Sequence, residues 1–204
     1  MCILYTTLSM DNKALLSKIN TLTQALISDA EFEDELMNEI QTNAKILQDK
    51  KETHVVPRLV VLHRKTFNKS FERTVCMFLD LPLDDEKHKM MMGLGARIAD
   101  ENINPVAILF TSEAWMKKAQ TEAEHEEVLK SKKKVREYDD KEEAIIVMGC
   151  TLDKREKAAI TMITHDEKGN IVTGAFKIID GVQNELLYRF YEGFTRAMVI
   201  KGRI

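Results

Sequence analysis

The stretch that decides the fold is NPVAILFTSEAW, residues 104–115. It contains an apolar run at residues 106–110, which then gives way to a polar pair and the only tryptophan of the chain. A short, continuous apolar run of this kind predicts a strand that is buried on both faces. We therefore expect residues 106–110 to form a core strand, with Ser112, Glu113 and Trp115 at its exit.

A hairpin and a helix precede this strand. Residues 55–63 and 73–79 are apolar and rich in β-branched side chains, and they flank a polar turn, which predicts two antiparallel strands. Pro82 ends the second strand, and acidic residues then begin a helix predicted over residues 84–100. The second strand, this helix and the strand at 106–110 form a βαβ unit, whose crossover should be right-handed.

Amphipathic helices are predicted towards both ends of the chain. Residues 11–49 carry an apolar stripe with a restart signal at Asp29, which indicates two helices or one long bent helix. The apolar residues do not repeat in heptads over the three or four repeats that a coiled-coil dimer needs. Packing of the stripe on the sheet is therefore the favoured interpretation. A closing helix carries its apolar stripe on six residues: Leu186, Leu187, Phe190, Tyr191, Phe194 and Met198.

The remaining strands are predicted as an antiparallel meander over residues 143–150, 158–165 and 171–178. The expected fold is α+β: a mixed, largely antiparallel sheet of about six strands with one βαβ unit, N-terminal helices and a C-terminal amphipathic helix packed on the sheet. We divide the chain into an N-terminal helical segment, residues 1–50, and an α+β core domain, residues 51–204. Residues 116–141 form a charged loop or helix inserted into that core.

Composition restricts the class of protein. Hydrophobic residues make up 44% and charged residues 31% of the 204 residues, which is typical of folded domains and argues against a disordered or fibrous chain. The net charge of −3 gives no general attraction to nucleic acid. Cys2, Cys76 and Cys150 have no paired spacing and indicate reduced thiols. We expect a cytoplasmic protein without a membrane-spanning segment.

Ser112 and Glu113 are the candidates for catalysis. At the end of a parallel strand they would occupy the place where open α/β sheets bind ligands. A serine nucleophile needs a base, and His63, at the end of another predicted strand, is the best of five histidines. The chain has no nucleophile-elbow motif, and no feature of the sequence brings His63 to Ser112. A role in satisfying backbone groups, or in binding an arginine at the strand end, is therefore favoured over hydrolysis.

Three segments occur in an order that is similar to a known family. They are GARIA at residues 95–99, FTSEAW at 110–115 and YDDKEEAIIV at 138–147. The order resembles a family of uncharacterised bacterial and phage proteins, in which a strand ending in Ser-Glu-Ala-Trp is followed by an acidic segment that enters an apolar strand. The resemblance implies a fold, and it implies no activity.

The strand exit and the acidic segment together form the predicted interaction site. Its residues are Trp115, Glu113, Asp139, Asp140 and Glu143. Tryptophan combines a large apolar surface with a polar N–H group and is enriched at the centres of protein interfaces. We expect recognition of a partner, rather than chemistry, at this place.

No metal ion or cofactor is predicted. The five histidines are scattered, and neither paired cysteines nor a zinc-binding helix motif occurs. Gly93 and Gly95 lie within a helical pattern that lacks the lysine of a phosphate-binding loop, so we attribute them to close packing of the helix against the sheet.

A basic tract is the main candidate for nucleic-acid binding, and it comprises Lys130, Lys132, Lys133 and Lys134. Because no aromatic residues interleave with the lysines, a solvated surface is the favoured interpretation.

The leading hypothesis is a non-catalytic cytoplasmic interaction or accessory domain of bacterial or phage origin, which binds a protein partner or self-associates. It is based on the weak case for catalysis and on apolar helical faces that exceed what the sheet needs. The alternatives are a small hydrolase that uses Ser112, Glu113 and His63, and a nucleic-acid accessory protein that uses the basic tract.

Overall fold

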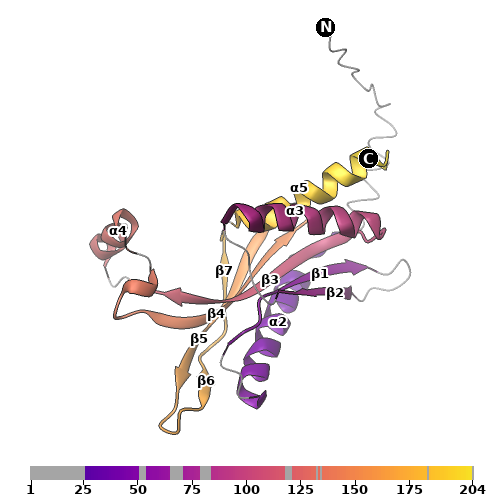
Figure 1. Ribbon diagram of the computed structural model, residues 1–204. Coiled ribbons are helices and arrows are strands. Elements are labelled where there is room, and N and C mark those ends of the chain that lie inside the picture. The colour runs from indigo at the N-terminus through magenta and orange to yellow at the C-terminus, as the bar shows by residue number, and fades with distance from the viewer. Residues whose placement is uncertain are drawn as a thin grey trace.

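The computed structural model describes residues 26–50, 54–64, 71–78, 84–117, 121–131, 133, 135–182 and 184–203. Helices and one antiparallel sheet form an α+β fold, which confirms the predicted class (Figure 1). The elements are α2 (Asp29–Lys50), β1 (Arg58–Arg64), β2 (Phe71–Met77), α3 (Asp84–Asp100), β3 (Pro105–Met116), α4 (Glu122–Lys130), a 3-10 helix (Val135–Glu137), β4 (Glu142–Thr151), β5 (Glu156–His165), β6 (Ile171–Thr173), β7 (Lys177–Asp180) and α5 (Glu185–Ile200).

The strands form one sheet in the order β2-β1-β3-β4-β5-β6, and β7 also pairs with β5. Every pairing is antiparallel. The expectation of a parallel strand at 106–110 is therefore wrong, because β3 lies between β1 and β4 and runs opposite to both. β2 and β3 both run opposite to β1, so they share a direction. The predicted βαβ unit is thus present, with β1 between its two strands and α3 connecting them.

Strand β3 is longer than the sequence predicts. The hairpin of β1 and β2 is confirmed, with Arg58 opposite Met77 at one end. β3, by contrast, continues through the polar pair and the tryptophan, and it pairs with β4 as far as Met116 opposite Glu142. The apolar pattern covers only the buried half of β3. The second half is held by main-chain hydrogen bonds to β4, which do not depend on apolar side chains.

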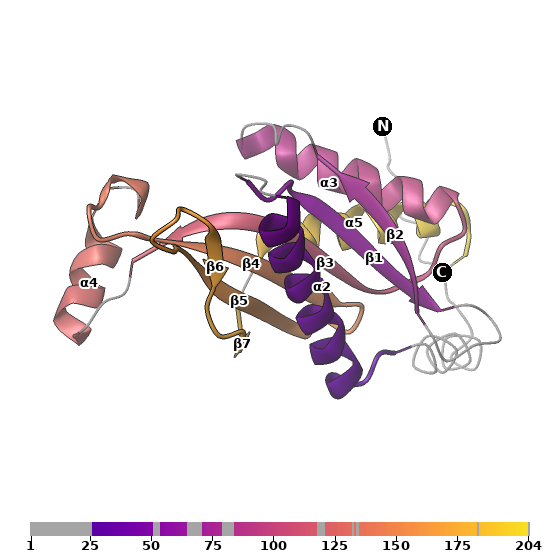
Figure 2. The same cartoon turned by 90° about the horizontal axis from the view of Figure 1, so that it is seen from below.

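Helix α2 covers one face of the sheet (Figure 2). Its first turn has a reciprocal cap, because the Ser28 hydroxyl accepts the Glu31 N–H at 3.2 Å and the Glu31 carboxylate accepts the Ser28 N–H at 2.8 Å. The residues that α2 buries recur every three or four positions: Phe32, Leu36, Ile40, Ala44 and Leu47. They share a core with β1, β3 and β4, so the predicted packing on the sheet is confirmed for α2. Residues 11–25 of the same prediction lie outside the described residues.

Helices α3 and α5 lie side by side on the opposite face (Figures 1 and 2). A Cβ atom at Gly95 would lie 2.0 Å from the Phe190 carbonyl oxygen, and one at Gly193 would lie 2.0 Å from the Met92 carbonyl oxygen. Both glycines therefore let the two helix backbones touch. Gly95 was expected to pack against the sheet, and its partner is instead α5. At Gly93 an added Cβ would meet no atom within 4 Å.

Four residues of the predicted apolar stripe of the closing helix are buried, namely Leu187, Phe190, Tyr191 and Phe194, in a core that also contains residues of β1 and β3. Leu186 and Met198 are partly buried against the same core. Most of the apolar surface of α2, α3 and α5 is thus covered within this chain, whereas Val199 and Ile200 at the end of α5 stay exposed. The described helices therefore give little support to the argument that surplus helical faces drive self-association. A different surface has to carry any interaction.

Candidate functional site

The predicted catalytic pair is not brought together. His63 lies opposite Pro105, and Ser112 is seven residues further along β3. At about 3.3 Å per residue, the two positions are roughly 23 Å apart, whereas a general base must lie within about 3 Å of its proton. His63 instead places its Nε2 3.2 Å from the Thr74 hydroxyl of β2. His63 therefore cannot serve as the general base for Ser112, as the hydrolase hypothesis requires.

Glu113 has a structural role that the sequence only partly suggested. Its carboxylate accepts a short hydrogen bond from the backbone N–H of Val55, and it lies 3.2 Å from His54 Nδ1. Val55 precedes β1, so its N–H has no partner in the strand ladder, and the carboxylate supplies one. Glu113 thereby fixes the segment that leads into β1. Satisfaction of a backbone group was one of the two roles expected for this residue, and the other was binding of an arginine.

The rest of the predicted interaction site lies on the projecting end of β3 and β4. Trp115 is 46% exposed, stands opposite Glu143, and has the Lys141 ammonium 5.3 Å from its ring centre. The Asp140 carboxylate is hydrogen-bonded to Lys117, and this bond holds the pKa of Asp140 below its usual value and raises the pKa of Lys117. The predicted residues do gather in one region, with Glu113 directed towards the body of the molecule.

The basic tract contributes little free charge in the described residues. Lys130 forms an ion pair of 2.7 Å with Glu126, and Lys133 lies 4.5 Å from the ring centre of Tyr138. Lys132 and Lys134 lie outside the described residues. α4, which contains Lys130, stands at the end of the β3–β4 hairpin, away from the other helices (Figure 1). No observation favours nucleic acid over solvent at this position.

A buried carboxylate lies between α2 and the sheet. Glu39 is 1% exposed, and its Oε1 accepts hydrogen bonds from Arg58 Nε at 2.7 Å and from the Thr111 hydroxyl at 3.1 Å. Arg73 NH1 approaches Oε2 at 3.4 Å, and the Asn43 amide donates to Oε1 at 3.2 Å. Buried charges are tolerated when they are paired and hydrogen-bonded in this way. The cluster links α2 to β1, β2 and β3.

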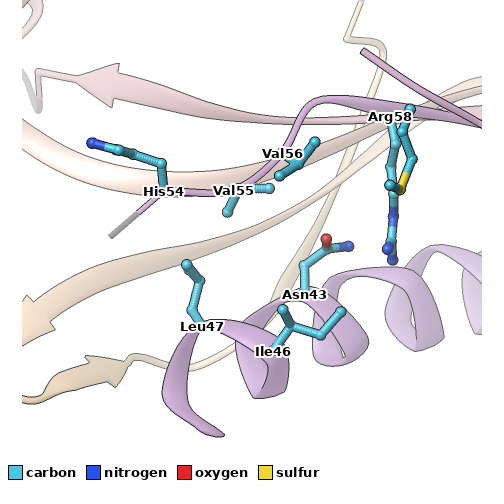
Figure 3. A pocket seen from close by; sticks show the side chains of 8 residues that line it. Asn43, Ile46, Leu47, His54, Val55, Val56 and Arg58 are labelled. Atoms are coloured by element: carbon cyan, nitrogen blue, oxygen red, sulfur yellow. The ribbon is translucent and has the colours of Figure 1, made fainter. Parts of the chain in front are cut away.

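A pocket of about 140 Å³ lies beside this cluster, between the C-terminal half of α2 and the start of β1. Its lining residues are Asn43, Ile46, Leu47, His54, Val55, Val56, Arg58 and Met77. Figure 3 shows Asn43, Ile46 and Leu47 directed from α2 towards the segment of His54 to Val56. The pocket is smaller than a typical ligand site of roughly 300 Å³ or more, and its size suits a single side chain rather than a whole ligand.

The pocket lies at the end of an open strand edge. Within the described residues, β2 pairs with β1 alone, so its outer main-chain edge has no partner strand. Its side chains alternate between the two faces, and Arg73, Val75 and Met77 share the α2 face, where Arg73 contacts Glu35 and Glu39. Val75 is 49% and Met77 64% exposed. Apolar surface and free backbone groups therefore coincide along β2.

Sequence reasoning missed this site, although signals for it were present. Glu39 stands three residues after Leu36 on the buried stripe of α2, which is an unusual place for a carboxylate. Arg58 interrupts the apolar run of residues 55–62, which enters β1. Opposite charges at two otherwise apolar positions indicate a buried ion pair, but the sequence does not say which charges meet.

Further observations limit the range of functions. Among the described residues, no group of three or more histidine, cysteine, aspartate or glutamate side chains could hold a metal ion. No described helix is long and apolar enough to cross a membrane. Searches of protein-family models, curated proteins and solved structures returned no match to this chain. The likeness to a family of bacterial and phage proteins therefore stays an expectation that is based on the quoted residues alone.

Proposed function

We propose that this chain is a non-catalytic cytoplasmic interaction domain that binds an extended segment of a partner protein along the outer edge of β2. The single observation that carries the proposal is the outer edge of β2, which has no partner strand among the described residues and carries the exposed side chains of Val75 and Met77. An extended segment that adds to such an edge gains main-chain hydrogen bonds along its length.

The composition of β2 supports this use of the edge. Proteins usually protect edge strands with lysine, proline, a bulge or an inward-pointing charge. In β2 the charged residues are Glu72 and Arg73 near its beginning, and Arg73 is paired with Glu35 and Glu39 of α2. The second half of the strand, Thr74 to Met77, carries no charge and no proline. An unprotected half-strand is expected where pairing with another chain is useful.

The opposite edge of the sheet provides a matched control. Val172 in β6 is 43% exposed, which is close to the 49% of Val75 in β2. β6, however, has only three residues, which offers little backbone for pairing. Lysine at either position adds the same charge to an exposed edge, so a difference between the two variants would be specific to β2.

The test is selection of a phage-displayed library of random eight-residue peptides against the full chain. We expect the selected peptides to bind the wild type and Val172→Lys equally, and to bind Val75→Lys at least tenfold more weakly. Hydrogen exchange should slow in β2 when a peptide binds. Equal binding by the three proteins, or no enrichment of any peptide, would refute the proposal. Circular dichroism and thermal melting establish that both variants are folded.

Self-association is a separate outcome of the same experiment. If light scattering shows a concentration-dependent dimer that Val75→Lys abolishes and Val172→Lys leaves intact, the partner strand belongs to a second copy of the chain.

A further inference from the structure

We infer that the pocket beside β2 receives one uncharged, apolar side chain of the bound segment, of about the size of leucine, methionine or phenylalanine. The inference rests on the proposed function, because it names the chemistry of the partner that pairs with β2. It assigns strand pairing to the edge and selectivity to the pocket, as is common when a peptide is recognised by strand addition.

The position of the pocket connects it to the edge. Met77 is the last residue of β2, and Arg58 is its cross-strand neighbour in β1; both side chains line the pocket. A segment paired along β2 therefore passes beside the pocket when it reaches Met77. Side chains of a strand point alternately to the two faces, so the segment can direct one of them towards the α2 face at this point.

The lining of the pocket determines the kind of side chain. Ile46, Leu47, Val55, Val56 and Met77 give it apolar walls. The charged group at its inner side, Arg58, is already bound through Nε to the carboxylate of Glu39. A lysine or arginine entering the pocket would meet the Arg58 cation, and a carboxylate would have to compete with Glu39 for it. Both kinds of charged side chain would also lose their hydration, so an uncharged side chain is favoured.

The volume of the pocket limits the size of the side chain. At about 140 Å³, it is close to a cavity of about 150 Å³, which is known to hold one benzene molecule. The volume therefore matches one medium-sized apolar group. Burial of such a group stabilises binding by an amount that corresponds to about tenfold or more in affinity.

The extent of the surface favours a short linear segment over a second folded copy. β2 has seven residues, and the pocket accepts one side chain. Stable dimers of folded proteins bury about 1,600 Å² in total, which is more than one short edge strand and one side chain provide. A short extended peptide is the occupant that this area suits.

The test uses the peptides selected against the full chain. Substitutions are made first in the protein and then in the peptide. In the protein, Val56→Phe places a larger side chain at the rim of the pocket, where Val56 is 40% exposed, and Val172→Phe is the matched control on the opposite edge. In the peptide, each apolar residue is replaced by alanine. The methyl resonance of Met77, in a protein labelled at methionine methyl groups, reports occupancy of the pocket independently of affinity.

We expect one apolar peptide position at which alanine weakens binding about tenfold or more, a similar loss with Val56→Phe, and a shift of the Met77 methyl resonance on binding. If peptides bind through β2 but show no such position, and Val56→Phe binds them normally, the pocket inference is overturned while the proposed function stands. If Val75→Lys has no effect on peptide binding, or no peptide binds, both are overturned. A dimer that depends on Val75 would overturn the assignment to a short peptide.

Discussion

On one face of the sheet, α3 and α5 meet backbone to backbone at Gly95 and Gly193. On the other face, α2 lies on the strands through an apolar stripe and through ion pairs to β1, β2 and β5. Both faces bury an apolar core. They differ in what fixes the position of the helices, since one relies on shape and the other combines apolar burial with charge pairing.

The two faces therefore differ in which groups lie beneath their helices. Backbone contact at Gly95 and Gly193 leaves no room for side chains between α3 and α5 at these positions. On the α2 face, buried polar groups lie between the helix and the strands, and the pocket at the end of β2 lies beside them.

The largest effect is expected at the glycine contact. Gly95→Ala places a methyl group 2.0 Å from the Phe190 carbonyl oxygen, so α3 and α5 must separate. We expect a loss of about 3 kcal/mol in the free energy of unfolding, the upper part of the range for overpacked positions. Urea denaturation followed by circular dichroism measures this loss.

Gly93→Ala is the matched control in the same helix, because an added Cβ there meets no atom within 4 Å. It should stabilise the protein by up to about 1 kcal/mol through the higher helix propensity of alanine. If Gly95→Ala were as stable as Gly93→Ala, the account of backbone contact between α3 and α5 would be wrong.

The next effect is expected at the buried carboxylate of the α2 face. Glu39→Gln keeps the shape of the side chain and removes the negative charge that Arg58 and Arg73 share. Removal of one partner from a buried ion pair typically costs about 3 kcal/mol or more; because Arg73 retains Glu35, we expect about 2 to 3 kcal/mol. Urea midpoints measure this loss.

The control is Glu185→Gln, which breaks an exposed pair with Arg189 on α5 and should leave the urea midpoint almost unchanged. Equal, small changes in the two variants would mean that charge pairing does not hold α2 on the sheet.

A smaller effect concerns the acid stability of the same face. Hydrogen bonds lower the pKa of Asp29 below its usual value of 3.8, and the bond from Lys157 contributes more than the bond from Arg155. The stability that Asp29 contributes is therefore present above about pH 4 and is lost as the pH falls through the lowered pKa. Asp29→Asn should be less stable than the wild type at pH 7, and the two should converge in acid.

Urea midpoints between pH 7 and pH 2.5 test this expectation, with Asp34→Asn as a control at an exposed position of the same helix. A difference between wild type and Asp29→Asn that stayed constant over the whole range would contradict it.

The last prediction concerns the reactivity of two thiols and involves no loss of stability at neutral pH. Burial raises the pKa of the Cys150 thiol to about 12 and raises that of the half-buried Cys76 less strongly. In a Cys2→Ser background at pH 8, iodoacetamide should modify Cys76 in the native protein and Cys150 only on unfolding. Because the pKa of the Cys150 thiol is raised in the folded protein, the stability linked to this thiol is present below about pH 9 and is lost as the pH rises towards 12. Mass spectrometry of the labelled peptides distinguishes the two thiols, and rapid native labelling of Cys150 would contradict its burial.

Much of the fold could be predicted because its elements have strong local patterns. The helix at Asp84–Asp100, the hairpin of β1 and β2, and the stripe of α5 all follow from the spacing of apolar residues and from breakers. The second half of β3 could not be predicted in this way. Its stability comes from the backbone of β4, which is separated from it by the charged insertion.

The candidate site was less predictable than the fold. Glu113 was singled out from the sequence, but for its place after an apolar run rather than for its contact with Val55. The prediction of a catalytic pair of Ser112 and His63 was wrong because the sequence does not indicate how far apart the ends of two strands lie. The pocket combines residues of α2, the segment before β1, and the end of β2, and no local pattern indicates that these meet.

The sequence by itself determined where helices and strands form and which of their residues turn inward, because periods of about 3.6 and 2 residues follow from backbone geometry. The tertiary structure alone decided that β1 lies between β2 and β3, that Gly95 faces α5, and that the edge of β2 ends beside a pocket. These features depend on contacts between residues far apart in the chain. Such contacts are chosen by packing and pairing over the whole molecule, and a local pattern does not record them.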